Sequence, residues 1–214
     1  MDYQSRRQVQ GEATRLAILD AAIRLTRQVG FDKMTIRDIC TAAGVTTGAF
    51  YRYYDSKEAL FTAMVGEQAE YVLSMFQNTL DDFEKLPGDE QTKQMINISN
   101  GCIAGLMDYI YDNHDAFKLL IEHAEGTAYA DFIHQLVVRE VDSTYSFIRT
   151  LTAGGHPVET IHKNLVHMIA SGLFTGIFEM IVHDMDREEA DQYVSQLARF
   201  YAAGWSELLG VTFG

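Results

Sequence analysis

The apolar residues of this chain recur mostly at helical spacing, three or four positions apart, and no segment alternates as a half-buried strand would. After residue 56 the strong helix breakers are confined to residues 86–89 and 153–157, with a weaker break at 125–127. The pattern predicts helices over residues 11–29, 36–43, 47–54, 57–85, 90–112, 115–124, 128–152, 158–184 and 187–209. We therefore predict an all-α protein.

Residues 35–61, TIRDICTAAGVTTGAFYRYYDSKEALF, predict two short helices around a tight turn. Thr35 and Asp38 have the spacing of a capping box, which starts the first helix. Gly44 directly follows the last periodic apolar residue, where a left-handed glycine ends a helix. Thr46 is placed to cap the second helix. This arrangement is a helix-turn-helix, a device that reads DNA.

The second of these helices is predicted to divide its side chains between two faces. Phe50 and Tyr54 share an inward face at a spacing of four residues. The outward face holds Thr47, Gly48, Tyr51, Arg52 and Tyr53. Small residues allow a helix to enter a major groove about 12 Å wide, while hydroxyl, guanidinium and phenol groups reach bases and phosphates.

The next helix is predicted to begin with a second capping box, formed by Asp55 and Glu58. Lys57 would then lie at a helix amino terminus, where backbone N–H groups favour an anion. We therefore predict that Lys57 contacts a DNA phosphate.

Together with the preceding helix AILDAAIRLTRQVGFDKM, these motifs resemble the amino-terminal domain of the TetR family of transcriptional regulators over residues 12–63. The shared segments are T-x-R-x-I-x-x-x-A-G-V, T-x-G-x-x-Y-x-Y-Y and S-K-E-A-L-F. The chain departs from the commonest family pattern at Thr46 and Thr47, where Ser and a basic residue are frequent, and at Tyr54, where Phe is usual. The phosphate affinity and base preference of this chain are therefore expected to differ from those of its relatives.

The resemblance implies two domains and assigns roles to the residues that match. Residues 1–60 would form a three-helix DNA-binding domain, and residues 61–214 a larger helical domain for effector binding and dimerisation. By resemblance and helical phase, Arg37, Thr46, Thr47, Gly48 and Arg52 would face bases or nearby phosphates, and Thr35, Tyr51, Tyr53 and Lys57 would hold the DNA backbone.

The charge distribution agrees with this division. The whole chain has a formal net charge of −13, which disfavours nucleic acid. Residues 1–60 nevertheless hold nine Lys or Arg against seven acids, whereas the remainder holds 8 against 23. A neutral-to-basic head on an acidic body favours DNA contact through the head alone, although solubility alone explains most of the acidic body.

The remaining composition predicts a folded cytoplasmic protein without a membrane span. The most apolar segment, residues 168–182, is interrupted by Glu179, and the first residues lack an apolar signal core. Cys40 and Cys102 lie in separate helical patterns without a C-x-x-C motif, so we expect reduced core thiols in a cytoplasm.

A helix-turn-helix head usually needs a partner, because operators present two half-sites one DNA turn apart. The last two predicted helices carry stripes of small and apolar residues, and we expect a homodimer through a four-helix bundle. The predicted interface is Ile161, Leu165, Met168, Gly172, Gly176, Leu197, Tyr201, Gly204 and Leu208. The alternative is that these stripes pack inside one subunit.

The resemblance also implies a pocket for a small effector in the body. The predicted lining is Met75, Met107, Tyr111, Phe117, Glu122, Tyr129, His134, Tyr145, His167, Phe174 and Phe178. Pockets are mostly apolar, so a small, largely apolar or aromatic effector is expected. The alternative is that these aromatic and Met side chains are core, since such residues at helical spacing more often are.

An enzyme is the competing class, supported by Glu159 and His162 at the spacing by which helical bundles bind two iron ions. The second Glu-x-x-His and the further acids of such a site are missing, as are hydrolase, P-loop and dinucleotide fingerprints. We therefore expect no enzyme activity, metal or cofactor.

The predicted function is a ligand-responsive repressor acting as a homodimer on a near-palindromic operator. The alternative is an architectural or cell-division DNA-binding protein without an effector.

Overall fold

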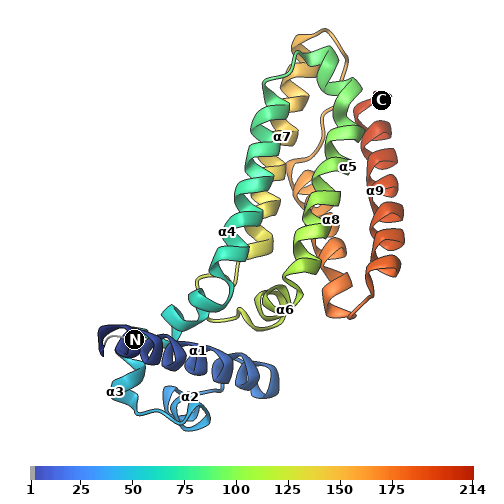
Figure 1. Ribbon diagram of the computed structural model, residues 1–214. Helices are drawn as coiled ribbons and strands as arrows, with labels where there is room; N and C mark the ends of the chain where they lie inside the picture. Colours follow the sequence, from blue (N-terminus) through green and yellow to red (C-terminus); the bar gives the residue numbers. More distant parts are fainter. Residues whose placement is uncertain (1–2) are drawn as a thin grey trace. The chain divides into compact units, whose positions relative to one another are not determined.

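A computed structural model describes the backbone of residues 3–214 and the side chains of residues 8–214. Within that range the chain forms helices and no strand, which confirms the all-α prediction (Figure 1). The helices are α1 (Tyr3–Val29), α2 (Ile36–Ala43), α3 (Thr47–Phe50), α4 (Lys57–Glu84), α5 (Gly88–Asp112), α6 (His114–His123), α7 (Phe132–Ala153), α8 (Lys163–Val182) and α9 (Arg187–Leu209).

Local polar groups account for two of the helix starts that differ from the prediction, those of α8 and α7. α8 begins at Lys163 and not at residue 158, since the ring Nδ1 of His162 accepts a hydrogen bond from Asn164 N at 3.2 Å. Before α7, the Thr127 hydroxyl accepts from Tyr129 N at 3.1 Å and keeps this segment in a turn. α3 ends at Phe50, and residues 51–53 continue as a turn.

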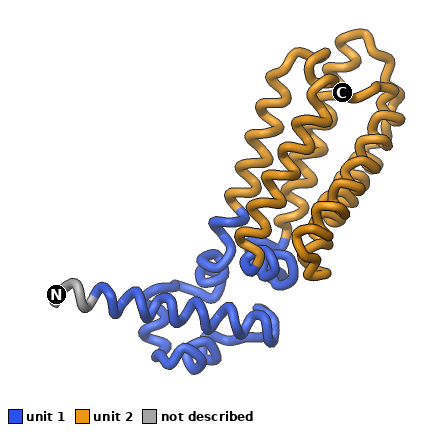
Figure 2. The backbone as a smooth tube through the Cα atoms, turned by 45° about the vertical axis from the view of Figure 1, so that its right-hand side comes forward, with its two compact units in different colours: residues 1–69, 115–130 blue, residues 70–114, 131–214 orange. Residues whose placement is uncertain are grey.

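The chain forms two compact units (Figure 2). Unit 1 contains residues 1–69 and 115–130, and unit 2 contains residues 70–114 and 131–214. The helices α4 and α6 each supply residues to both units. The predicted domain boundary after residue 60 stays a prediction.

Unit 1 is built on the apolar faces of its short helices. Ile18 on α1, Ile39 on α2 and Phe50 on α3 are buried, together with Leu60 and Phe61 on α4. The Phe31 and Phe61 rings pack at a tilt with their centroids 4.6 Å apart, which anchors the loop after α1 to α4. Burial of each large apolar side chain contributes about 1.5–3 kcal/mol, so this core fixes the positions of helices too short to be stable alone.

Lys57 ties the loop between α1 and α2 to the start of α4. Its Nζ donates to the carbonyl oxygens of Phe31 at 2.9 Å, Met34 at 3.2 Å and Asp32 at 3.3 Å. The ammonium also lies 4.5 Å from the centroid of the Phe31 ring, within cation–π range. All three donors of the ammonium therefore serve the protein itself.

Unit 2 is a bundle of α5, α7, α8, α9 and the later part of α4, which run beside one another in both views (Figures 1 and 2). Phe83, Phe147, Leu151, Leu209 and Val211 form a buried cluster at one end. The helix α8 has the length and composition of a possible membrane span, at 20 residues and a mean hydropathy of 1.8. It packs against α7 and α9 with seven buried side chains, as the core helix of a bundle does.

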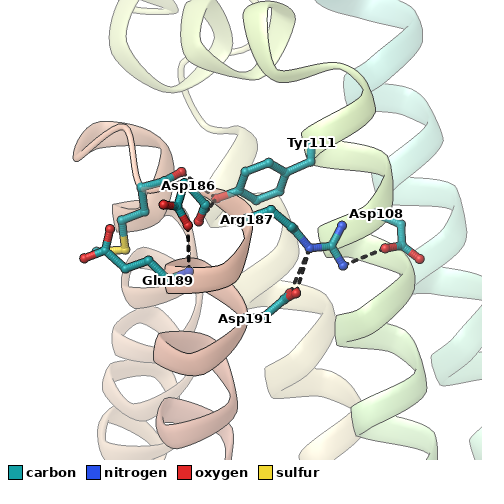
Figure 3. Close-up of polar contacts among 7 residues, drawn as sticks. Asp108, Tyr111, Asp186, Arg187, Glu189 and Asp191 are labelled. Carbon is teal, nitrogen blue, oxygen red and sulfur yellow. Dashed lines mark hydrogen bonds and ion pairs between the residues drawn. The ribbon is translucent and has the colours of Figure 1, made fainter.

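At the other end of unit 2, polar groups join α5 to the start of α9 (Figure 3). Arg187 Nη2 lies 2.7 Å from Asp108 Oδ1, and the Tyr111 hydroxyl donates to the carbonyl oxygen of Met185 at 2.8 Å. Asp186 caps α9 by accepting from Glu189 N at 2.9 Å. These contacts fix the α8–α9 turn on α5.

Replacing Lys57 with alanine should destabilise unit 1, because three carbonyl groups lose a charged donor. Hydrogen bonds to charged groups contribute about 1.5–3 kcal/mol, so we expect a decrease of that order in the free energy of unfolding by urea. Lys33→Ala is the matched control, since Lys33 is exposed near the same loop. Equal stability of the two variants would contradict the role assigned to Lys57.

Candidate nucleic-acid interface and cavity

The caps predicted for the helix-turn-helix are present in the structure. Thr35 N donates to Asp38 Oδ2 at 2.9 Å, and Asp38 N donates to Thr35 Oγ1 at 3.2 Å, which completes the capping box of α2. Gly44 ends α2 at φ 67° and ψ 32°, in the left-handed region that favours glycine. Thr46 caps α3, since its hydroxyl accepts from Ala49 N at 3.1 Å.

The start of α4 departs from the prediction. The cap is Ser56, whose hydroxyl accepts from Ala59 N at 3.0 Å, and not Asp55. Ser56 stands directly before the first helical residue, so its side chain reaches the third helical N–H as an N-cap must. The phosphate contact predicted for Lys57 stays a prediction, and the phosphate would compete with the three carbonyls that the ammonium already binds.

The side chains of α3 and of the turn after it divide into an inner and an outer face, as predicted. Phe50 is fully buried and Tyr54 is 5% exposed, whereas Tyr51 is 55% exposed. Six further residues predicted to contact DNA are also exposed: Thr35, Arg37, Thr46, Thr47, Gly48 and Arg52. Tyr53 is half-buried, and its hydroxyl lies close to Gly11 of α1. Their contacts with DNA stay a prediction, but the geometry leaves hydroxyls, guanidinium groups and phenols directed away from the core.

Gly48 has no packing role among the residues that the structure describes. A Cβ built at this position would lie 3.9 Å from its nearest neighbour outside the adjacent backbone, the Thr46 hydroxyl, and Gly48 has a helical φ. Neither crowding nor backbone conformation therefore requires glycine here. The missing side chain leaves the α3 backbone open to close approach from outside the protein.

Unit 2 contains a partly open cavity of about 170 Å³, lined by residues of α4, α5, α7, α8 and α9. Its wall is mostly apolar and aromatic, with Phe76 from α4, Phe174 from α8 and Trp205 from α9 among the lining side chains. The Phe76 and Phe174 rings meet edge to face at 5.2 Å. For scale, an engineered apolar cavity of about 150 Å³ accepts benzene, so this cavity has room for one ring-sized group.

Glu140 of α7 contributes a carboxyl group to this apolar wall. Its side chain is half-buried in the bundle, and Glu140 is one of the residues that line the cavity. No hydrogen bond or ion pair joins it to another side chain of residues 8–214, and burial raises the pKa of Glu140 to about 7. The carboxyl group is therefore poised between its neutral and charged forms near neutral pH.

The other titratable groups in the wall are Cys102 of α5 and Tyr201 of α9. Burial raises the pKa of both, and the nearby Glu140 carboxylate raises the pKa of Cys102 further. Both stay neutral around pH 7 for this reason. The lining residues, all of which the structure describes, include no Lys, Arg or His, so Glu140 has no counter-charge there.

The residues predicted to line an effector pocket are spread over both units. Phe174 lies in the cavity wall described here. Phe117, Glu122 and Tyr129 belong to unit 1, and the remaining seven belong to unit 2 outside this wall: Met75, Met107, Tyr111, His134, Tyr145, His167 and Phe178. For all eleven residues, Phe174 included, contact with an effector stays a prediction.

The sequence-based reading overlooked Glu140 although its pattern marks the position. One face of α7 buries Phe132, Leu136, Ser143 and Phe147. Glu140 lies on the same face, between Leu136 and Ser143. An acid at a core position of an amphipathic helix signals a buried carboxyl group. Trp205 of α9 is another residue of the cavity wall that the predicted lining did not include.

The predicted dimer interface divides into inward and outward residues. Gly172 and Gly176 lie against Tyr201 and Leu197, so the close packing there joins α8 to α9 within the chain. Ile161 packs against the buried cluster of unit 2. Leu165, Met168, Gly204 and Leu208 are exposed, with Met168 at 68%. Phe200 of α9 is also exposed, at 74%.

The candidate iron-binding pair lacks the helix that its spacing requires. Glu159 and His162 lie in the loop before α8, and His162 serves as the cap of that helix. Two residues three apart share a face only on a helix, so this loop gives no helical chelating pair.

Replacing Glu140 with glutamine should remove a pH dependence of stability. The folded protein holds the Glu140 proton more tightly than the unfolded chain, so the wild type loses stability as pH rises from about 4.5 to about 7. We expect Glu140→Gln to gain up to about 3 kcal/mol over the wild type between pH 5 and pH 8, measured by urea unfolding. Glu159→Gln, at an exposed position, is the control. If the free energy of unfolding changed with pH in the same way for the wild type and Glu140→Gln, the raised pKa of Glu140 would be refuted.

Comparison with known proteins agrees with the helix-turn-helix geometry. Residues 18–64 match the family model described as bacterial regulatory proteins, tetR family. An uncharacterized HTH-type transcriptional regulator of Haemophilus influenzae is 22% identical over 191 residues, 87% of this chain and 84% of that protein. The uncharacterized HTH-type regulator YvdT of Bacillus subtilis is 40% identical over 82 residues, 38% of this chain and 39% of its own.

The fold of the whole chain also has a solved counterpart. The transcriptional regulator FadR of Bacillus subtilis, crystallised with stearoyl-CoA, superposes with a TM-score of 0.55 at 14% identity, over 89% of this chain and 98% of FadR. These relatives are transcriptional regulators, a non-enzymatic role. These matches support a TetR-family transcriptional regulator, with the family model itself covering residues 18–64.

Proposed function

We propose that this protein is a cytoplasmic, ligand-responsive repressor without enzyme activity that binds a near-palindromic operator as a homodimer. The outward face of α3 is the observation that carries the proposal. Tyr51 and Arg52 are exposed beside Gly48, whose open position suits close approach of the helix to base edges. Arg37 and Thr47 add donors for bases and phosphates at the same surface.

The proposed dimer uses the exposed apolar residues of α8 and α9. Leu165 and Met168 lie on α8, and Phe200, Gly204 and Leu208 lie four residues apart on α9. Large exposed apolar side chains grouped on neighbouring helices are typical of protein interfaces, and small residues between them allow close helix approach. A two-fold pair of such surfaces would form the expected four-helix bundle.

The cavity in unit 2 favours a ligand-responsive protein over an architectural DNA-binding protein of the same fold. An architectural role requires no internal space, whereas an unfilled cavity with one ionisable group costs stability. The apolar and aromatic wall fits the expected class of effector, a small and largely apolar or aromatic molecule.

Selection of bound sequences from a random duplex pool at about 0.15 M salt tests the proposal. The expected result is an inverted repeat. Gly48→Ala should then weaken operator binding by about 1–3 kcal/mol, because a methyl group stands between α3 and the base edges, while raising stability by up to about 1 kcal/mol. Gly101→Ala on α5, where a Cβ also meets open space, is the control with unchanged DNA binding. Failure to enrich any sequence would overturn the proposal of operator binding.

Introducing a charge at Phe200 should dissociate the dimer. Phe200→Glu places a carboxylate within the proposed apolar contact, so sedimentation at micromolar concentration should change from dimer to monomer. Val138→Glu is the matched control, because Val138 is an exposed apolar residue of α7 outside the proposed interface. A wild-type monomer, or a Phe200→Glu dimer as stable as the control, would rule out this interface.

A further inference from the structure

The cavity of unit 2 combines aromatic walls with one unpaired acid. Glu140 faces this space, and no Lys, Arg or His lies among the residues that line it. A buried carboxylate without a counter-charge is costly, and proteins ordinarily pair such groups or bury them neutral. Among residues 8–214, no side chain pairs with Glu140 in this way.

We propose that the cavity binds a compact lipophilic amine whose ammonium group pairs with the carboxylate of Glu140. The inference deepens the proposed function, since it names the class of effector for the same cavity. Its basis is the position of Glu140 in the cavity wall, where the ligand can supply the charge that the protein lacks.

The aromatic part of the wall favours the same ligand. Phe76, Phe174 and Trp205 present rings to the cavity, and the faces of aromatic rings attract cations. The same rings provide an apolar surface for the hydrocarbon part of the ligand. An anionic ligand would meet the opposite situation, because Glu140 would repel it and no basic residue of the wall would compensate.

The volume of the cavity limits the size of the ligand. At about 170 Å³ it is slightly larger than the cavity of about 150 Å³ that holds benzene, so it accepts one ring with a one-carbon substituent. Benzyl compounds with different end groups are therefore suitable probes. We select benzylamine as the cation, benzyl alcohol as the neutral analogue and benzoate as the anion.

Trp205 provides a direct signal of binding. It is the single Trp of the chain and lines the cavity, so its fluorescence reports occupation without DNA. We expect the wild type at pH 8 to bind the amine at least about tenfold more tightly than the alcohol, and benzoate most weakly. Calorimetric titration checks the same affinities independently of fluorescence.

The Glu140→Gln variant tests the role of the charge. Its side chain has nearly the same size, so it should still bind the alcohol but lose the preference for the amine. Glu159→Gln, exposed in the loop before α8, should keep the wild-type preference. Equal affinities of the wild type for amine and alcohol, or an undiminished amine preference in Glu140→Gln, would overturn the proposal, as would no binding of the amine at millimolar concentration.

The pH dependence of the wild type provides a second test that requires no variant. Only the ionised carboxylate pairs with the ammonium, and the pKa of Glu140 is raised to about 7, so affinity for the amine should increase about tenfold from pH 6 to pH 8. The amine itself stays protonated over this range. Cys102 and Tyr201, the other titratable groups of the wall, stay neutral because burial raises the pKa of each. A pH-independent affinity would contradict the ion pair.

These measurements separate the present inference from the proposed function. Amine binding without any effect on operator binding would leave the cavity inference intact and remove ligand-responsive repression. Operator binding without a preference for the amine would remove the cavity inference and leave the proposed DNA-binding function intact. The fluorescence and calorimetric readouts need no DNA, so each outcome counts against one proposal alone.

Discussion

The DNA-binding geometry of this protein depends on the burial of one face of each short helix in unit 1. The helices α2 and α3 have eight and four residues, and helices of this length are unstable alone in water. They persist because Ile39 and Phe50 are buried in a core that also contains Ile18 and Leu60. Since this core determines which side of α3 points inward, it also determines that Tyr51 and Arg52 point outward.

Unit 2 departs from close packing, and the departure is costly. Protein interiors are normally filled to the density of organic crystals, and a void or an unpaired carboxyl group lowers stability. The bundle nevertheless contains both features at one place, at Glu140. Binding sites commonly carry such local costs, because groups left unsatisfied by the protein are available to a ligand. The polar contacts of Arg187 and Tyr111 with neighbouring elements stabilise the bundle elsewhere.

The sequence predicted best those features that depend on neighbouring residues. The capping box at Thr35, the left-handed Gly44 and the cap at Thr46 all follow from contacts within five residues, and the structure has each of them. The start of α4 was misjudged because Asp55 and Ser56 are both good caps, and the choice depends on how the chain enters the helix.

Features that depend on distant parts of the chain were less predictable. The cavity needs five helices to leave a gap together, so no local pattern locates it. Apolar side chains such as Met107 and Phe178 have the same spacing in a core as in a pocket, and both are buried in the bundle. The acid within the buried stripe of α7 did carry a local signal, because a core position rarely holds an unpaired carboxyl group.

Coupling between cavity and DNA requires two states of the protein with different affinities for the ligand. The helix α4 is the covalent route by which such a difference can act, since it supplies Leu60 to the unit 1 core and Phe76 to the cavity wall. An ammonium group bound at Glu140 would favour whichever arrangement of that wall brings the charges closest. Without a ligand charge the opposite arrangement is favoured, because an unpaired carboxylate is least costly where water reaches it or a proton neutralises it. A charged ligand therefore distinguishes two arrangements of the wall far more strongly than a purely apolar ligand of the same size could.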